Sequence, residues 1–290
     1  MKHLINLVIA AGVFIFTKTY ADLISYNSIE ISGKNLLQQI LIITFVVQWV
    51  AYVPAYALKT EKFYDLTGGL TYLSIFIYCL IATQSIEHVK FSNIIVAGAI
   101  MIWAIRLGSF LFMRIVRDGK DKRFNLIKTS FSRFFMTWTL QGMWVFICSS
   151  SALVAITSPT GVIVNNVFIL GFLLFFAGFV IEVIADNQKS KFRSIEENRD
   201  SFINEGLWSR SRHPNYFGEI ILWLGITVMS ISSFSGINYL AIFSPIFTYL
   251  LLNYISGIRI LEARGNEKWG HLDEYNNYKE NTPKLIPKIF

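Results

Sequence analysis

Long apolar runs separated by short polar segments account for most of the chain. An α-helix needs about 20 apolar residues to cross the hydrocarbon core of a bilayer, and most of the runs have roughly that length. Eight candidate spans are predicted, at residues 4–20, 36–58, 66–84, 93–113, 134–157, 161–185, 215–233 and 238–258. The first run also fits a secretory signal cleaved after Ala21, but we favour an uncleaved helix. The pattern predicts an all-α fold, a polytopic transmembrane bundle of seven or eight helices.

Basic residues fall almost wholly on one side of this scheme. Lys2, the polar segments 59–65, 114–133 and 186–212, and the tail from residue 259 hold 22 of the 26 lysines and arginines. Cytoplasmic loops carry such an excess in membrane proteins. The long loops and the C-terminus are therefore predicted to be cytoplasmic, in a multi-pass protein of a bacterial inner membrane. The loop and the tail are long enough to form a short helical cap.

Composition agrees with a membrane protein and argues against a nucleic-acid partner, a disulfide and a metal site. Hydrophobic residues make up 53% of the chain and charged residues 16%, which excludes an ordinary soluble domain. The net charge of +7 does not indicate nucleic acid, because the lysines and arginines lie between the apolar runs. Both cysteines lie inside apolar runs and the four histidines are scattered, so neither a disulfide nor a metal site is expected. Residues 1–35 are predicted to form an N-terminal helix and loop, and residues 36–290 one membrane domain.

The most unusual polar cluster comes directly before the seventh predicted span. Arg212 and His213 precede Pro214, which favours the first position of a helix. Basic side chains beside a helix N-terminus form an anion site, typically for phosphate, although a positive-inside anchor explains the arginines alone. Asn215 and Glu219 share one helix face, with Tyr216 beside them, and an ionisable residue inside an apolar span is functional by default.

A second polar stripe ends the sixth predicted span. Glu182, Asp186 and Arg193 fall on one helix face, and Lys191 lies next to them. Structural salt bridges would explain the stripe. Alternatively, the carboxylates accept ribose or amide hydrogen bonds while the cations bind phosphates. This second interpretation predicts a cofactor-binding region from about residue 180 to 290.

Further polar residues lie on the same predicted side of the membrane. Each of them also has a structural explanation, as a snorkelling side chain, a solvated loop or an amphipathic surface helix. They are Arg106 within the fourth span, Asp121 and Arg123 after it, and Glu262, Arg264, Tyr275 and Tyr278 in the tail. Together with the two clusters above, they supply the cations, carboxylates and aromatic rings that a large anionic cofactor needs.

These motifs resemble the steroid 5α-reductase family of integral membrane reductases, and more closely its bacterial branch, known as a domain of unknown function. The similarity extends from about Tyr64 to the end and is most specific over residues 206–219. The residues that carry it are Ser211-Arg212-His213-Pro214-Asn215-Tyr216-Phe217-Gly218-Glu219, Glu182…Asp186…Arg193, Trp103…Arg106, Asp121…Arg123, Tyr275-x-x-Tyr278 and Leu285-Ile286-Pro287.

The resemblance implies a helical membrane bundle that binds NADPH in its cytoplasmic half. It implies that Asp186 and Arg193 bind the nucleotide, that Asn215 contacts the nicotinamide end, and that Glu219 and the tail tyrosines complete the pocket. The family also uses a glutamate and a tyrosine to polarise the substrate ketone, and this chain has no clear match for the glutamate. Tyr64, Asp65 and Tyr72 are the candidates for that role by chemistry alone.

The expected reaction is hydride transfer from NADPH to an activated C=C bond of a lipophilic substrate, such as a steroid-like or isoprenoid enone. Two alternatives stay open. A membrane methyltransferase would hold S-adenosylmethionine with the same Arg-His-Pro motif. A transport or lipid-binding protein would have polar residues near the bilayer midplane rather than on one side.

Overall fold

The structure is a computed structural model that describes residues 1–86, 90–198 and 200–288. The chain divides into two compact units. Unit 1 comprises Met1–Asn165 and Met229–Ile242, and unit 2 comprises Asn166–Val228 and Phe243–Phe290. The seventh span, Pro214–Ser233, thus begins in unit 2 and ends in unit 1.

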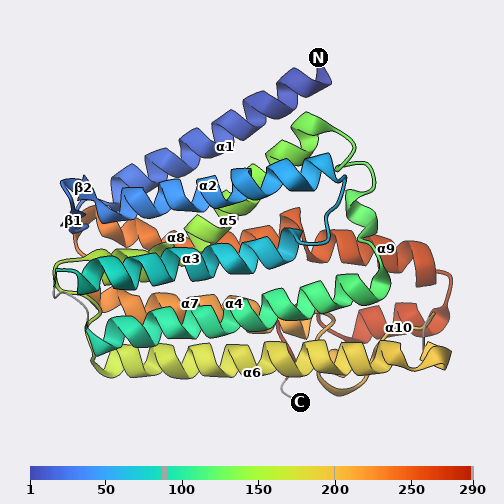
Figure 1. Cartoon of the computed structure of the whole chain (residues 1–290). Helices are drawn as coiled ribbons and strands as arrows, with labels where there is room; N and C mark the ends of the chain where they lie inside the picture. Colours follow the sequence, from blue (N-terminus) through green and yellow to red (C-terminus); the bar gives the residue numbers. More distant parts are fainter. Residues whose placement is uncertain (87–89, 199, 289–290) are drawn as a thin grey trace. The chain divides into compact units, whose positions relative to one another are not determined.

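The described residues of unit 1 form five long helices, one short strand pair and three 3-10 turns. The helices are α1 (Lys2–Ile24), α2 (Leu36–Ala57), α3 (Tyr64–Gln84), α4 (Phe91–Asp118) and α5 (Phe131–Thr157), the strands are β1 (Glu30–Ile31) and β2 (Lys34–Asn35), and the turns are Lys122–Phe124, Ile231–Ser233 and Gly236–Ile242. Figure 1 shows α2, α3 and α4 side by side. α5 packs against α1 to α4 and is buried along its whole second half, so it forms the centre of this unit.

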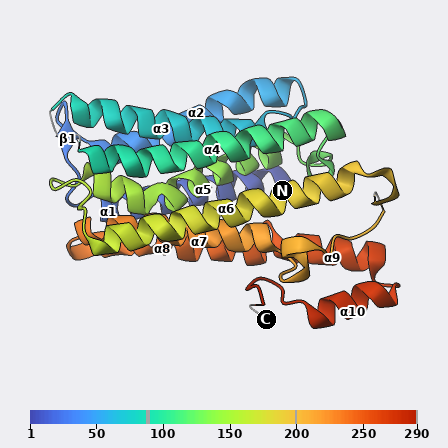
Figure 2. The same cartoon turned by 90° about the horizontal axis from the view of Figure 1, so that it is seen from below.

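Unit 2 contains one very long helix and a series of shorter ones. The helices are α6 (Asn166–Ser194), α7 (Pro214–Ser230, of which residues to Val228 belong to this unit), α8 (Phe243–Leu250), α9 (Ile258–Trp269) and α10 (Asp273–Asn281), with 3-10 turns at Glu196–Asn198 and Gly206–Ser209 and a π turn at Leu251–Ile255. Figure 2 shows α6 beside α7, and α10 beside α9.

All eight predicted spans are helical segments long and apolar enough to cross a membrane, so the all-α, multi-pass architecture is confirmed. Their ends differ from the prediction. α4 continues to Asp118 and α6 to Ser194, because polar residues with good helix propensity prolong both helices. The last span is interrupted after the π turn, and α9 begins only at Ile258. The sidedness of the loops and the cleavage of the first segment stay predictions.

Four glycines explain why α6 and α7 lie so close together. A Cβ on Gly178 would come within 2.5 Å of the Gly218 carbonyl oxygen, and one on Gly225 within 2.7 Å of the Gly171 carbonyl oxygen. Each helix carries its two glycines seven residues apart, which places them on one stripe. Small residues of this kind let two membrane helices approach backbone to backbone. The pairing is antiparallel, so the last turns of α6 meet the beginning of α7.

Candidate functional site

Near the start of α7, the α6 and α7 faces that carry the four glycines carry polar residues instead. Asn215 Nδ2 donates a hydrogen bond to Asp186 Oδ1 at 3.1 Å. Glu182, Asp186 and Glu219 are all buried, with 2%, 6% and 6% of their surface exposed. A buried carboxylate is costly unless it is hydrogen-bonded or paired. Glu182, Asp186, Asn215 and Glu219, four of the predicted cofactor-binding residues, thus lie together at one end of the α6–α7 interface.

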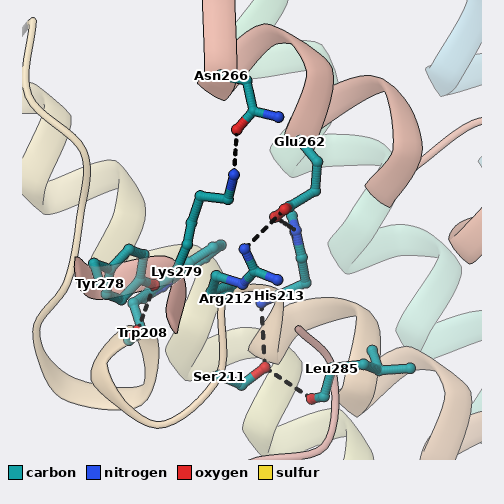
Figure 3. A network of polar contacts seen from close by, with 9 residues as sticks. All are labelled: Trp208, Ser211, Arg212, His213, Glu262, Asn266, Tyr278, Lys279 and Leu285. Carbon is teal, nitrogen blue, oxygen red and sulfur yellow. Dashed lines mark hydrogen bonds and ion pairs between the residues drawn. The ribbon is translucent and has the colours of Figure 1, made fainter. Parts of the chain in front are cut away.

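Glu262 of α9 joins the two basic residues that precede α7. Its Oε2 accepts a bond from Arg212 Nη1 at 2.9 Å, and its Oε1 lies 2.9 Å from His213 Nε2. Figure 3 shows both basic side chains meeting this one carboxylate. The predicted anion site at the start of α7 thus already contains one internal anion, which takes up part of its positive charge.

The geometry leaves two polar atoms of this cluster for another molecule. Burial disfavours the imidazolium and lowers the pKa of His213 below its usual 6.5, although the nearby Glu262 carboxylate acts in the opposite direction. The neutral ring donates its Nε2–H to Glu262, which makes Nδ1 an acceptor. His213 Nδ1 and Arg212 Nε are buried and have no hydrogen-bond partner among the described residues. One acceptor and one cationic donor therefore lie next to the first turn of α7.

The C-terminal tail holds the segment before α7 in place. The Arg212 N–H donates to the Pro283 carbonyl at 2.9 Å, and the Lys288 N–H donates to the Arg210 carbonyl at 2.9 Å. Between them, Ser211 Oγ donates to the Leu285 carbonyl at 2.7 Å. These bonds give a structural role to the Leu-Ile-Pro motif of the tail.

The tail tyrosines pack on the loop between α6 and α7. Tyr278 donates its O–H to the Trp208 carbonyl at 2.6 Å, and Trp208 Nε1 donates to the carbonyl of Ala185, the neighbour of Asp186. The Phe202 ring contacts Tyr275 and Tyr278 with centroids 5.1 and 5.4 Å apart. Burial raises the pKa of both tyrosines above 10.0, so both stay protonated and uncharged near neutral pH. In addition, the Tyr216 ring stacks on His213 at 5.8 Å.

Three predicted cofactor-binding residues lie at the exposed surface of unit 2. Lys191 and Arg193 are exposed. Arg193 shares the face of Asp186, but it lies seven residues, or about 10 Å, beyond it along α6, and α7 begins opposite Asp186. Arg264 is also exposed and lines a shallow groove on α9. It follows Glu262 by two positions, which places it about 200° around the helix from Glu262, and Glu262 faces inward.

The candidate catalytic residues belong to unit 1. Asp65 and Tyr72 line a cavity of about 30 Å³ between α3, α4 and α5. Tyr64 does not line it, and instead donates its O–H to the Thr137 carbonyl at 3.0 Å. Two of the three candidates, Asp65 and Tyr72, therefore share the cavity, and Tyr64 lies outside it.

Three further candidates from the sequence have local partners in unit 1. The Arg106 guanidinium lies over the Phe110 ring at 5.2 Å, which fits a snorkelling residue. Asp121 forms an ion pair with Arg123 at 2.5 Å. Burial disfavours the charged form of Asp121, but the Arg123 hydrogen bonds more than offset it and hold the pKa of this carboxyl below its usual range.

Several polar residues of unit 1 were not predicted from the sequence. Gln141 and Trp144 of α5 line the unit 1 cavity. Glu61, which is 1% exposed, accepts bonds from Lys128 Nζ at 2.5 Å and from the Asp121 N–H at 3.0 Å. A glutamine inside an apolar span was an available signal for Gln141. The ion pair between Glu61 and Lys128 joins two loops far apart in the sequence, and no local pattern reveals it.

The fold and the buried polar clusters define a multi-pass α-helical membrane protein. Within that class, the chain belongs to the family described as "Protein of unknown function (DUF1295)", whose model matches residues 51–282. The chain is also distantly similar to two curated proteins, and in each case the match spans less than half of both proteins.

The first relative is "Steroid 5-alpha-reductase DET2" of Arabidopsis thaliana, 29% identical over 125 residues, which are 42% of each protein. The second is "3-oxo-5-alpha-steroid 4-dehydrogenase 1" of Mus musculus, 28% identical over 120 residues, which are 41% of this chain and 42% of the relative. No solved structure matches the chain.

Proposed function

We propose that the protein is an NADPH-dependent membrane reductase that acts on an activated C=C bond of a lipophilic substrate. The observation that carries this proposal is the similarity to two proteins named as a steroid reductase and a steroid dehydrogenase. The eight apolar spans support an apolar substrate, because such a substrate is concentrated in the bilayer. We place the unit 2 cluster on the cytoplasmic side, where the excess of basic residues supports it.

The residues of unit 2 fit an anionic dinucleotide. Arg212 Nε is a buried cationic donor without a partner among the described residues, which suits a phosphate oxygen. His213 Nδ1 is an acceptor, which suits a ribose hydroxyl or a carboxamide N–H. Asp186 and Asn215 are held against each other by a hydrogen bond and lie beside the start of α7. Arg212, His213, Asp186, Asn215 and Glu219 would therefore hold the cofactor, which supplies a hydride when bound.

Asp65 and Tyr72 are our candidates for the group that polarises a substrate carbonyl. They line a mostly apolar cavity, in which a hydrogen bond is stronger than in water. Tyr64 suits this role less well, because its hydroxyl already donates to a backbone carbonyl. The Tyr72 hydroxyl can donate a hydrogen bond to such a carbonyl, and Asp65 can donate one in its protonated form.

Binding assays on the detergent-purified chain test the proposal. NADPH, NADH and S-adenosylmethionine are compared by isothermal titration calorimetry, and we expect binding of NADPH. Arg212→Met should weaken it by about 10- to 100-fold, because one charge-assisted hydrogen bond contributes about 1.5–3 kcal/mol. Arg259→Met is the matched control, since Arg259 is exposed on α9. Binding of S-adenosylmethionine in place of NADPH, or equal effects of the two variants, would overturn the assignment.

A further inference from the structure

The unit 1 cavity contains more polar chemistry than the proposed reduction requires. It lies between α3, α4 and α5, and its volume of about 30 Å³ is enough for one water molecule or one hydroxyl group. Its lining is largely apolar, and two of its polar residues, Gln141 and Trp144, have no role in the proposed reaction.

Gln141 presents an acceptor that the protein does not satisfy. The side chain is 2% exposed, and its Nε2 donates to the Tyr64 carbonyl at 3.2 Å. That bond identifies which end of the amide is nitrogen, because a carbonyl accepts only from an N–H. Gln141 Oε1 is buried and has no hydrogen-bond partner in the part of the chain that the structure describes. Gly68 leaves room for this amide, since a Cβ there would come within 2.8 Å of Nε2.

Trp144 presents a donor of the same kind. It follows Gln141 by three residues on α5, so the two side chains share one helix face. Trp144 Nε1 is buried and, within the described residues, donates to no acceptor. An indole N–H can only donate, and a buried donor without an acceptor destabilises the fold. The cavity therefore has one unsatisfied acceptor and one unsatisfied donor on the same wall.

We infer that this cavity binds the hydroxyl group of a lipophilic alcohol. A hydroxyl both donates and accepts, so it can satisfy Gln141 Oε1 and Trp144 Nε1 together. A ketone oxygen can only accept, and it would leave the Gln141 oxygen unpaired. The lining residues Leu107 and Leu111 are half-buried, so the apolar body of the alcohol can lie along them while only its polar end enters.

Photolabelling of the parent chain in lipid nanodiscs tests this inference. The probes are 2-dodecanol with a diazirine near its hydroxyl group, the corresponding ketone 2-dodecanone, and the hydrocarbon in which a methyl group replaces the hydroxyl. Mass spectrometry of the digested protein locates and quantifies the label. We expect the alcohol to label α3 and α5. The ketone should label them about tenfold less, because it leaves one buried group unpaired, and the hydrocarbon less still, because it leaves both unpaired.

Matched variants separate the cavity from general effects on the fold. Gln141→Leu and Trp144→Phe remove the unsatisfied groups with little change of shape, and we expect each to lower alcohol labelling about tenfold. Gln48→Leu and Trp138→Phe are the controls, since Gln48 Oε1 and Trp138 Nε1 are also buried without partners but do not line the cavity. The controls should label like the parent.

Two results would overturn the inference. Equal labelling by the alcohol and the hydrocarbon would mean that the cavity holds at most a water molecule. A loss of labelling in the controls as large as in the cavity variants would mean that Gln141 and Trp144 matter only for packing. No result depends on NADPH or on turnover, so NADPH binding to unit 2 can stand while this inference fails, and the reverse. A preference of the cavity for the alcohol over the ketone would count against Asp65 and Tyr72 as the groups that polarise a substrate carbonyl.

Discussion

The contact between α6 and α7 gives the sharpest prediction, in the variant Gly218→Ala. The added Cβ would lie 2.6 Å from the Gly178 carbonyl oxygen and 2.7 Å from the Glu182 backbone nitrogen. Both are main-chain atoms, so no side-chain rotation relieves the overlap and the helices must separate. Overpacking of this kind costs about 1–3 kcal/mol. Separation also stretches the hydrogen bond between Asn215 and Asp186, which contributes about 1 kcal/mol.

Alanine gains back part of this cost, because it is about 1 kcal/mol more favourable than glycine inside a helix. We therefore expect Gly218→Ala to lower the free energy of unfolding by about 2 kcal/mol. Gly98→Ala in α4 is the matched control, since a Cβ at Gly98 would meet no atom within 4 Å. The control should be neutral or up to about 1 kcal/mol more stable than the parent.

Denaturant titration in mixed micelles, followed by circular dichroism, measures both variants. NADPH titration of the folded Gly218→Ala protein adds a functional reading, and we expect weaker binding because the cofactor candidates on the two helices move apart. If Gly218→Ala unfolds at the same denaturant concentration as Gly98→Ala, the two helices are not in backbone contact and the account of the α6–α7 interface is refuted.

Three further predictions concern unit 2. Glu262→Gln should cost about 1–3 kcal/mol of unfolding free energy by weakening the bonds to two basic side chains, whereas Glu267→Gln, on the exposed face of α9, should cost under about 0.5 kcal/mol; equal losses would contradict the bridge. Because the pKa of His213 is lowered in the folded state, the unfolded chain binds more protons below about pH 6.5, so stability should fall on acidification. His213→Gln should reduce this loss in melts between neutral and acidic pH, and an unchanged pH dependence would argue against a buried neutral ring. Tyr278→Phe removes the bond to the Trp208 carbonyl and should cost about 1 kcal/mol in the same titration; an unchanged unfolding free energy would mean that this bond does not stabilise the fold.

Hydropathy was sufficient to predict the long helices, because a membrane span must satisfy its own backbone and so depends mainly on length and composition. The start of α7 at Pro214 followed from the fixed φ of proline and its missing N–H. The proximity of Asp186 and Asn215 could be predicted only in part. Helix periodicity predicts which residues share a face, but it does not predict which other helix packs against that face. The glycine stripes carried that information, and the sequence interpretation did not use them.

Other features depend on contacts between segments that are far apart in the chain. The cavity residue Gln141 became visible only once α5 was packed against α3, because the bond from its amide to the Tyr64 carbonyl crosses between helices. The inward direction of Glu262 depends on how α9 is rotated about its own axis. The helix is interrupted at residues 256–257, so the periodicity of the preceding span does not predict this rotation. Rotation and packing are tertiary properties, so a single sequence does not reveal them.

The pairing of residues 210–212 with residues 283–288 sets an order of events during synthesis on the ribosome. About 70 residues separate the two segments of this contact. The basic segment is therefore without its main-chain partners until α7 to α10 have been translated. A ribosome that stops before Pro283 would release a chain whose helices can already enter the bilayer but whose basic segment is not fastened. The bonds of residues 283–288 would then be among the last contacts of this segment to form, and a product that stops before Pro283 would leave the basic segment open to proteases.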